Sequence, residues 1–133
     1  FGAGAVLMDP TTCDPLYRRS IRVSLGHVLR VPFAPLEPWP AALADLRSAG
    51  WTTVALTPAA EAEPLDRVTS AGLGPVALLV GAEGPGLAPG TVAAADRRIR
   101  IPLAAGVDSL NVATATAIAL NHLVPHPGQQ LDG

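Results

Sequence analysis

Residues 76–86 read Val-Ala-Leu-Leu-Val-Gly-Ala-Glu-Gly-Pro-Gly, and this stretch decides the fold class. Its first five residues are continuously apolar and run straight into a glycine, which is typical of a strand buried in a parallel sheet. The following loop holds three glycines around one carboxylate, Glu83. Glycine lets the backbone approach a ligand closely, so the loop is a candidate site, although an ordinary strand-to-loop turn also explains it. The loop has neither the Gly-Lys-Ser/Thr of a P-loop nor the Gly-x-Gly-x-x-Gly spacing of dinucleotide folds.

Strands and helices alternate on both sides of this stretch. Further strands are expected at 5–8, 30–34, 52–57 and 98–101, with helices over 38–49 and 111–123 and another beginning at Asp14-Pro15. This order predicts an α/β domain whose sheet is mainly parallel, with helices on both faces. The helix over 111–123 is apolar on nearly every side, so we expect it to be buried all round.

Length and composition limit the class of protein. The chain has 133 residues, 49% of them apolar and 15% charged, which fits one packed domain over residues 1–124 and a flexible tail over 125–133. No run of 18 apolar residues is present, so no membrane span is expected. The first residues contain no Met and no basic segment, which indicates an excised fragment rather than a signal peptide. Cys13 is the one cysteine; it cannot form an internal disulfide, which favours a cytoplasmic location.

All nine cationic residues are arginines, and most of them fall into two groups. The net charge of −2 does not by itself indicate a nucleic-acid-binding protein. Arginine forks suit phosphate, but they serve equally in solvated faces and in ion pairs between subunits. Arginines at a helix start oppose the helix dipole, so Arg18, Arg19 and Arg22 are expected to serve a partner, either RNA or another subunit. The groups comprise Arg18, Arg19, Arg22 and Arg30, and Arg97, Arg98 and Arg100.

A second polar segment joins the strand at 98–101 to the last helix. Ile101-Pro102-Leu103 is followed, after a short loop, by Asp108-Ser109-Leu110-Asn111-Val112. Asp, Ser and Asn are ordinary helix-capping residues, and a helix start is also a natural place for a polar ligand group. Both this loop and the one at 81–86 follow strands, where parallel sheets bind ligands.

Taken together, these segments resemble the SpoU/TrmH branch of the SPOUT RNA methyltransferases. Val80–Leu87 is similar to that family's second motif, and the stretch from Arg100 to Leu120 is similar to its third, with Ile-Pro followed by Ser-Leu-Asn-Val. The arginine-rich segment is similar to the stretch after the first motif. The resemblance covers residues 1–123.

The resemblance implies a fold, a cofactor and an activity. It implies a C-terminal trefoil knot, a homodimer, and transfer of a methyl group from S-adenosylmethionine to a ribose 2′-hydroxyl of rRNA or tRNA, with Arg18, Arg19 and Arg22 contacting the RNA. It assigns Glu83 to orienting the active-site loops and Asn111 to holding the knot and the site geometry. No metal is expected, because His27, His122 and His126 have no ligand spacing. The residues it implies for the cofactor are Thr57, Gly81, Ala82, Ile101 and Leu110.

The sequence also departs from the family pattern. The Asn and Arg of the first motif are expected just upstream of Phe1, and this sequence does not contain them. One alternative is therefore a non-catalytic knotted module for RNA binding or dimerisation. Another is a nucleotide-binding α/β domain with a different chemistry.

Overall fold

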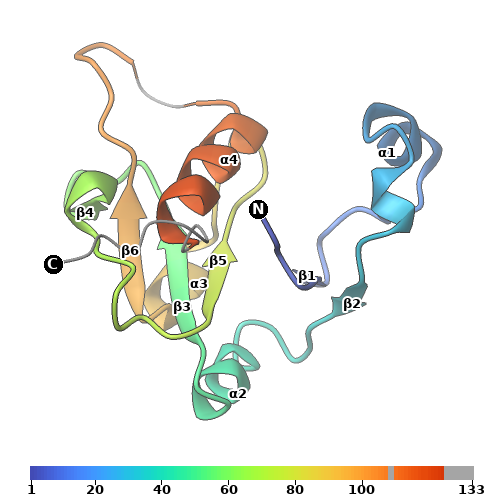
Figure 1. Cartoon of the computed structure of the whole chain (residues 1–133), viewed down its shortest axis with the longest axis horizontal. Helices are drawn as coiled ribbons and strands as arrows, with labels where there is room; N and C mark the ends of the chain where they lie inside the picture. The colour runs from blue at the N-terminus through green and yellow to red at the C-terminus, as the bar shows by residue number, and fades with distance from the viewer. Residues whose placement is uncertain (108–109, 125–133) are drawn as a thin grey trace, which may run out of the picture. The chain divides into compact units, whose positions relative to one another are not determined.

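The computed structural model describes residues 1–107 and 110–124, and the expected tail at 125–133 lies outside them. The chain divides into two compact units, one over residues 2–42 and the other from Leu43 onward. Figure 1 labels their helices and strands. No helix in the described ranges is both long and apolar enough to cross a membrane.

The unit from Leu43 onward is built on a four-stranded parallel sheet, in the order β4-β6-β3-β5. The edge strand β5 is apolar throughout, Val-Ala-Leu-Leu, whereas the central strands β3 and β6 place Val54 and Ile99 in the core among polar neighbours. In the register, Val54 of β3 lies opposite Leu78 of β5 and Arg97 of β6. The strands are β3 (Thr52–Leu56), β4 (Glu63–Pro64), β5 (Val76–Leu79) and β6 (Arg97–Arg100).

One face of this sheet packs against α4 (Val112–Leu123), which lies in front of the strands in Figure 1. Val54 and Ile99 are fully buried and belong to one cluster with Ala119 and Leu123 of the helix. The short 3-10 helix η2 (Leu65–Arg67) completes this core. Alternate residues of a strand point to opposite faces, so the other side of β3 must bury Thr53 and Ala55.

Both Thr53 and Ala55 are indeed fully buried. The helix α2 (Leu43–Ser48) packs against β3, and α3 (Pro89–Ala94) lies behind the sheet in Figure 1. The expected α/β class with a mainly parallel sheet is therefore confirmed, and helices lie on both of its faces.

The unit over residues 2–42 is a small parallel crossover. Its two strands, β1 (Val6–Met8) and β2 (Phe33–Pro35), pair in parallel, with Val6 opposite Phe33. Between them lie α1 (Arg18–Val23) and the 3-10 helix η1 (His27–Leu29). The carboxylate of Asp9 accepts hydrogen bonds from Thr11 and Thr12 and closes the loop after β1.

Two local expectations were wrong, for identifiable reasons. The first helix begins at Arg18 and not at Pro15, because Asp14 Oδ1 accepts a hydrogen bond from Leu16 N at 2.8 Å and caps a tight turn instead. The last helix is not buried all round: only Ala119 and Leu123 are buried, and Ile118 is 40% exposed. Half of the residues in α4 are alanine or threonine, whose side chains are small, and the buried Ala119 and Leu123 on one face are enough to pack against the sheet.

Candidate functional site

A cavity of about 290 Å³ lies where β3, β5 and β6 end and α4 begins. Because the strands are parallel, their carboxyl ends share one edge of the sheet, and the loops that follow them converge there. The two polar segments predicted from the sequence, 81–86 and 101–111, meet at this edge. The lining is Leu56, Thr57, Pro58, Val80, Gly81, Ala82, Glu83, Gly84, Gly86, Ile101, Leu103, Leu110, Asn111, Val112 and Ala115.

The loop after β5 folds tightly back on itself. Gly86 N donates to Ala82 O at 2.9 Å, and Ala82 and Gly86 form an isolated antiparallel bridge. A Cβ on Gly81 would stand 2.0 Å from the carbonyl carbon of Gly86, so only glycine fits there. Gly84 and Gly86 adopt φ of +93° and +69°, a conformation that favours glycine. The three glycines thus bring bare backbone to the wall of the cavity.

The loops after β3 and β6 supply the neighbouring wall. Thr57 N donates to Ile99 O at 2.9 Å, which extends the β3–β6 pairing up to the cavity. The Thr57 hydroxyl accepts a hydrogen bond from Ala59 N at 3.3 Å and holds the start of its own loop. Ile101 follows β6 directly and closes this side with an apolar surface.

Asn111 occupies the N-cap position of α4. Its Oδ1 accepts hydrogen bonds from Ala113 N at 2.9 Å and Thr114 N at 3.3 Å. These are two of the backbone donors that a helix start otherwise leaves without a partner. The side-chain oxygen is therefore engaged in the helix, and the side-chain amide is the group with which Asn111 can meet a ligand.

Glu83 is the one ionisable side chain among the lining residues. It is exposed and forms no hydrogen bond or ion pair with any residue in the described ranges. The predicted role of Glu83 in orienting the active-site loops stays a prediction. The Glu83 carboxylate is free to meet a ligand at the mouth of the cavity.

The cavity alone would suit many small molecules, and similarity to known proteins narrows the choice of ligand. The sequence pattern of the SpoU rRNA Methylase family matches residues 1–121. The chain belongs to this family. The match includes all the segments that line the cavity.

Relatives and solved structures agree with the SpoU assignment. An uncharacterized tRNA/rRNA methyltransferase of Mycobacterium tuberculosis is 47% identical over 116 residues, which are 86% of this chain and 40% of the relative. The 23S rRNA (guanosine-2′-O-)-methyltransferase of Haemophilus influenzae is 32% identical, over 92% of this chain and 49% of the relative. The AdoMet-bound rRNA methyltransferase of Sinorhizobium meliloti matches in structure with a TM-score of 0.77 and 32% identity, covering 93% of this chain and 48% of that one. The SpoU-family chain therefore spans about half the length of these proteins or less.

All seven pocket residues predicted from the sequence line this one cavity of the SpoU-family chain. They are Thr57, Gly81, Ala82, Glu83, Ile101, Leu110 and Asn111. Sequence reasoning missed the apolar floor, in particular Val112 and Ala115 of α4. A signal existed for Ala115, because it lies one helical turn beyond Asn111 and so projects from the same side of the helix.

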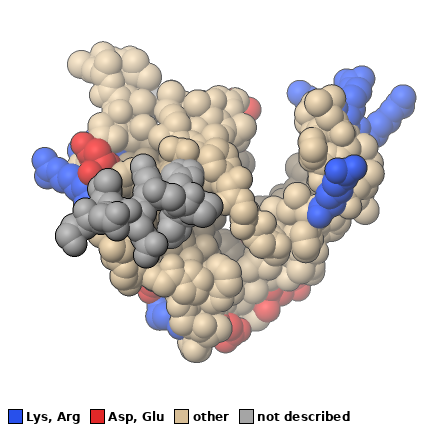
Figure 2. All heavy atoms as spheres, in the orientation of Figure 1, with Lys and Arg blue, Asp and Glu red and all other residues tan. Residues whose placement is uncertain are grey.

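The two groups of arginines differ in their surroundings. Arg97 pairs with the Glu63 carboxylate, Arg98 Nε donates to Val92 O at 3.3 Å, and Arg100 Nε donates to Ala62 O at 3.1 Å. In the first group, by contrast, no arginine pairs with an acidic residue of the described ranges. Figure 2 shows cationic side chains gathered over the segment labelled α1 in Figure 1. The second group thus stabilises the sheet, and the first is available to a partner.

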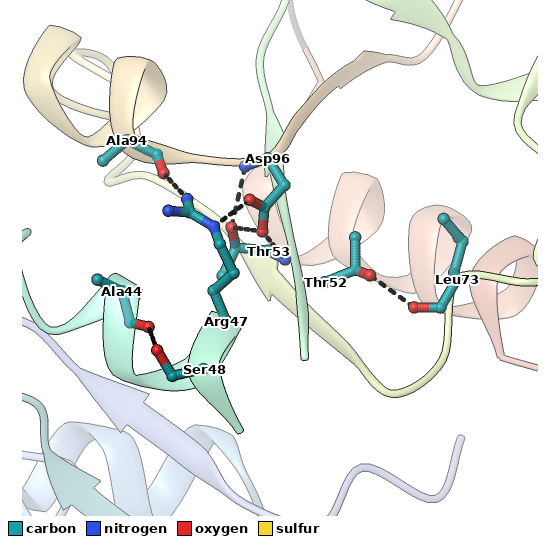
Figure 3. A network of polar contacts seen from close by, with 8 residues as sticks. All are labelled: Ala44, Arg47, Ser48, Thr52, Thr53, Leu73, Ala94 and Asp96. Atoms are coloured by element: carbon teal, nitrogen blue, oxygen red, sulfur yellow. Dashed lines mark hydrogen bonds and ion pairs between the residues drawn. The ribbon is translucent and has the colours of Figure 1, made fainter. Parts of the chain in front are cut away.

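A second polar cluster lies at the opposite end of β3 (Figure 3). The Asp96 carboxylate accepts hydrogen bonds from Thr53 Oγ1 at 2.6 Å and Thr53 N at 2.9 Å, and it pairs with Arg47. The pKa of the Asp96 carboxyl lies below its ordinary value, mainly because the Thr53 hydroxyl donates a hydrogen bond to it. The backbone N–H of Thr53 and the Arg47 guanidinium lower this pKa further. The Asp96 carboxylate has hydrogen-bond partners within the cluster, which joins α2 and β3 to the residue before β6. We therefore assign it a structural role and no ligand.

Proposed function

We propose that this chain forms the S-adenosylmethionine-binding core of an RNA ribose 2′-O-methyltransferase acting on rRNA or tRNA. The observation that carries the proposal is the single cavity shared by the loops at 81–86 and 101–111. Residues 87–100 separate these loops in the sequence, and the parallel strands β5 and β6, on either side of β3, bring them to one edge of the sheet. The relatives are RNA methyltransferases that include a guanosine-2′-O enzyme, and this supports the same reaction.

The residues present fit S-adenosylmethionine. Gly81, Gly84 and Gly86 offer backbone groups without side chains in front of them, and Ala82 and Ala115 leave room for a flat ring. Leu56, Ile101 and Leu110 supply the apolar surface that an adenine needs, and a few polar groups set its orientation. Glu83 is suited to a cationic or hydroxyl group at the mouth. When bound, the cofactor supplies a methyl group made electrophilic by its sulfonium.

The chain's own residues contribute mainly positioning. The Asn111 cap fixes the start of α4, and the bridge between Ala82 and Gly86 fixes the facing loop, so a ligand between them is held in one orientation. Orientation of two reacting groups can lower a barrier by about 7–11 kcal/mol. Removing the proton from the 2′-hydroxyl contributes about 10²–10⁴-fold more. The resemblance assigns that step to an arginine of the family's first motif.

The proposal includes the quaternary arrangement and the knot. A homodimer is supported by the exposed apolar side of α4, where Ile118 is 40% exposed. The knot requires the last helix to pass through a loop formed by the preceding chain, and membership of the SpoU family supports it. Both stay proposals for the whole protein.

Calorimetry tests the cofactor part of the proposal directly. S-adenosylmethionine and S-adenosylhomocysteine should bind the chain, and NAD should not. Ala115→Leu places a bulky side chain in the floor of the cavity, and binding should fall by at least about tenfold, since 1.4 kcal/mol is a factor of ten. Ala113→Leu is the matched control, because Ala113 is exposed on the same helix and does not line the cavity. Equal loss in both variants would contradict the assigned pocket.

The reaction itself is tested with labelled cofactor and rRNA or tRNA. A methyl group on a ribose 2′-oxygen blocks alkaline cleavage of the adjacent phosphodiester, so a gap in the hydrolysis ladder identifies the modified position. Glu83→Gln and Asn111→Ala should each reduce the transfer rate. Cofactor binding without transfer to any RNA would leave the non-catalytic knotted module as the function.

A further inference from the structure

The helical unit formed by α1 and η1 carries a strong local charge. Residues 15–36 contain Arg18, Arg19, Arg22 and Arg30 and no Asp or Glu, although the whole chain has a net charge of −2. No acidic residue of the described ranges pairs with these four arginines. Such a concentration of unpaired guanidinium groups fits a polyanion.

The same unit displays an aromatic ring. Tyr17, the one tyrosine of the chain, is 64% exposed and immediately precedes Arg18 and Arg19. Its backbone is fixed, because Tyr17 N donates to Asp14 O at 3.0 Å and Tyr17 O accepts from Ile21 N at 3.1 Å. The side chain itself makes no hydrogen bond to any described residue. Proteins that bind single-stranded nucleic acid combine aromatic side chains, on which bases stack, with neighbouring cationic residues. Tyr17, with its fixed backbone, and the adjacent Arg18 and Arg19 provide this combination.

An exposed leucine reinforces this picture. Leu25 is 87% exposed and adopts φ of +51°, and in the described ranges it is the one residue other than glycine with a positive φ. Hydrogen bonds on either side, from Gly26 N to Ile21 O at 2.9 Å and from His27 N to Ser24 O at 2.9 Å, hold it there. Leu25 follows the C-cap of α1, and the left-handed conformation that ends this helix leaves the leucine side chain on the surface beside the arginines.

We propose that Tyr17 and Leu25 contact unpaired nucleobases while the four arginines contact the flanking phosphates, so that the RNA bound is single-stranded at this point. This inference rests on the proposed function, which supplies RNA as the partner. In a duplex the base faces are hidden in the stack, and a protein reads phosphates and 2′-hydroxyls. Apolar side chains among arginines gain contact area only from bases that are splayed out.

A second copy of the chain is the competing occupant of this surface. A symmetric dimer contact would place the same patch on both sides of the interface. Arg18, Arg19 and Arg22 would then face their own counterparts, and residues 15–36 contain no acid to compensate them. RNA supplies the opposite charge, so the charge favours RNA.

The test measures binding of two fluorescent RNA probes by anisotropy, a short oligouridylate and a hairpin duplex of equal length. Tyr17→Ala should weaken binding of the oligouridylate by about 5- to 30-fold and leave the duplex unchanged. Tyr17→Phe keeps the ring and should bind as the wild type does. Leu25→Asn removes the apolar side chain but suits the positive φ, so it should fold normally and also weaken only the unpaired probe.

The salt dependence separates the two kinds of contact. Arg19→Gln should weaken both probes and reduce the slope of log K against log salt, whereas Tyr17→Ala should leave that slope unchanged. The inference is overturned if Tyr17→Ala weakens both probes equally, if the wild type binds neither, or if the variant changes the oligomeric state without changing RNA binding. Calorimetric binding of S-adenosylmethionine is independent of these results, so failure here does not remove the proposed pocket.

Discussion

At the scale of single residues, Gly81 imposes the strictest steric requirement at the site. Its missing side chain leaves space for the backbone of Gly86 and Leu87, which would lie 2.0 and 2.2 Å from an added Cβ. Gly81→Ala must push this loop open, and overpacking of that kind costs about 1–3 kcal/mol. We expect a lower free energy of unfolding in urea, together with loss of S-adenosylmethionine binding in the calorimeter, because the same loop lines the cavity.

Gly90→Ala is the control for this prediction. Gly90 lies in α3, has no atom within 4 Å of an added Cβ, and has no positive φ. Alanine in a helix is favoured over glycine by about 1 kcal/mol, so this variant should be as stable as the wild type or slightly more stable. If Gly81→Ala unfolds at the same urea concentration as Gly90→Ala and still binds the cofactor, the loop is not closed as described.

At the scale of elements, the start of α4 combines a structural and a binding role in Asn111. Asn111→Ala removes the oxygen that accepts from Ala113 N and Thr114 N and should lower the free energy of unfolding by about 1 kcal/mol. Asn111→Asp keeps that oxygen and places a negative charge at a helix start, where it is favourable, so stability should be retained. Urea denaturation of the two variants checks this; equal destabilisation of both would contradict the cap.

The same pair of variants separates the two roles. Asp has no side-chain amide, so a ligand that uses the Asn111 amide should bind Asn111→Asp more weakly even though the helix is intact. Unchanged cofactor binding by Asn111→Asp would restrict Asn111 to the cap. Sequence reasoning recognised both possibilities, because Asn is a common N-cap and the helix start follows a strand.

Elements with a strong local pattern could be predicted from the sequence, and others could not. β5 and α4 were predicted almost to the residue, since a long apolar run or a long helical repeat is a local property. The two-residue β4 has no pattern of its own; it exists because Glu63 lies opposite Ile99 of β6 and pairs with Arg97. The helix expected at 38–49 shortens to Leu43–Ser48 for a related reason, because prolines at 38 and 40 do not extend the helical hydrogen bonds.

The candidate site shows the same division. The glycines and the cap residue were visible in the sequence because each has a steric or hydrogen-bonding reason that depends on its neighbours. Val112, which has no such relation to a polar residue, became recognisable as a floor residue only when α4 was placed beside the loop at 81–86. From the sequence alone, an apolar residue that lines a cavity cannot be distinguished from one that is buried in the core.

At the scale of the whole molecule, the Asp96 cluster couples folding of the unit from Leu43 onward to pH. Asp96 draws together Arg47 of α2 and Thr53 of β3, and the Arg47 Nη2 also donates to Ala94 O at 2.9 Å. Because these donors favour the carboxylate, the pKa of Asp96 in the folded protein lies below its ordinary value of 3.8. The unfolded chain therefore binds a proton at a pH where the folded protein does not.

The sign of the effect follows from this difference. Stability from the Asp96 carboxylate is fully present above the ordinary pKa and is lost as the pH falls through the lower, folded-state value. We expect urea denaturation to show wild type more stable than Asp96→Asn at about pH 7, with the difference shrinking below about pH 4. Asp45→Asn is the control, since the Asp45 side chain is exposed on the same helix as Arg47 and no ion pair to it is found among the described residues. A difference between wild type and Asp96→Asn that is the same at every pH would mean that shape, and not charge, makes the cluster stabilising.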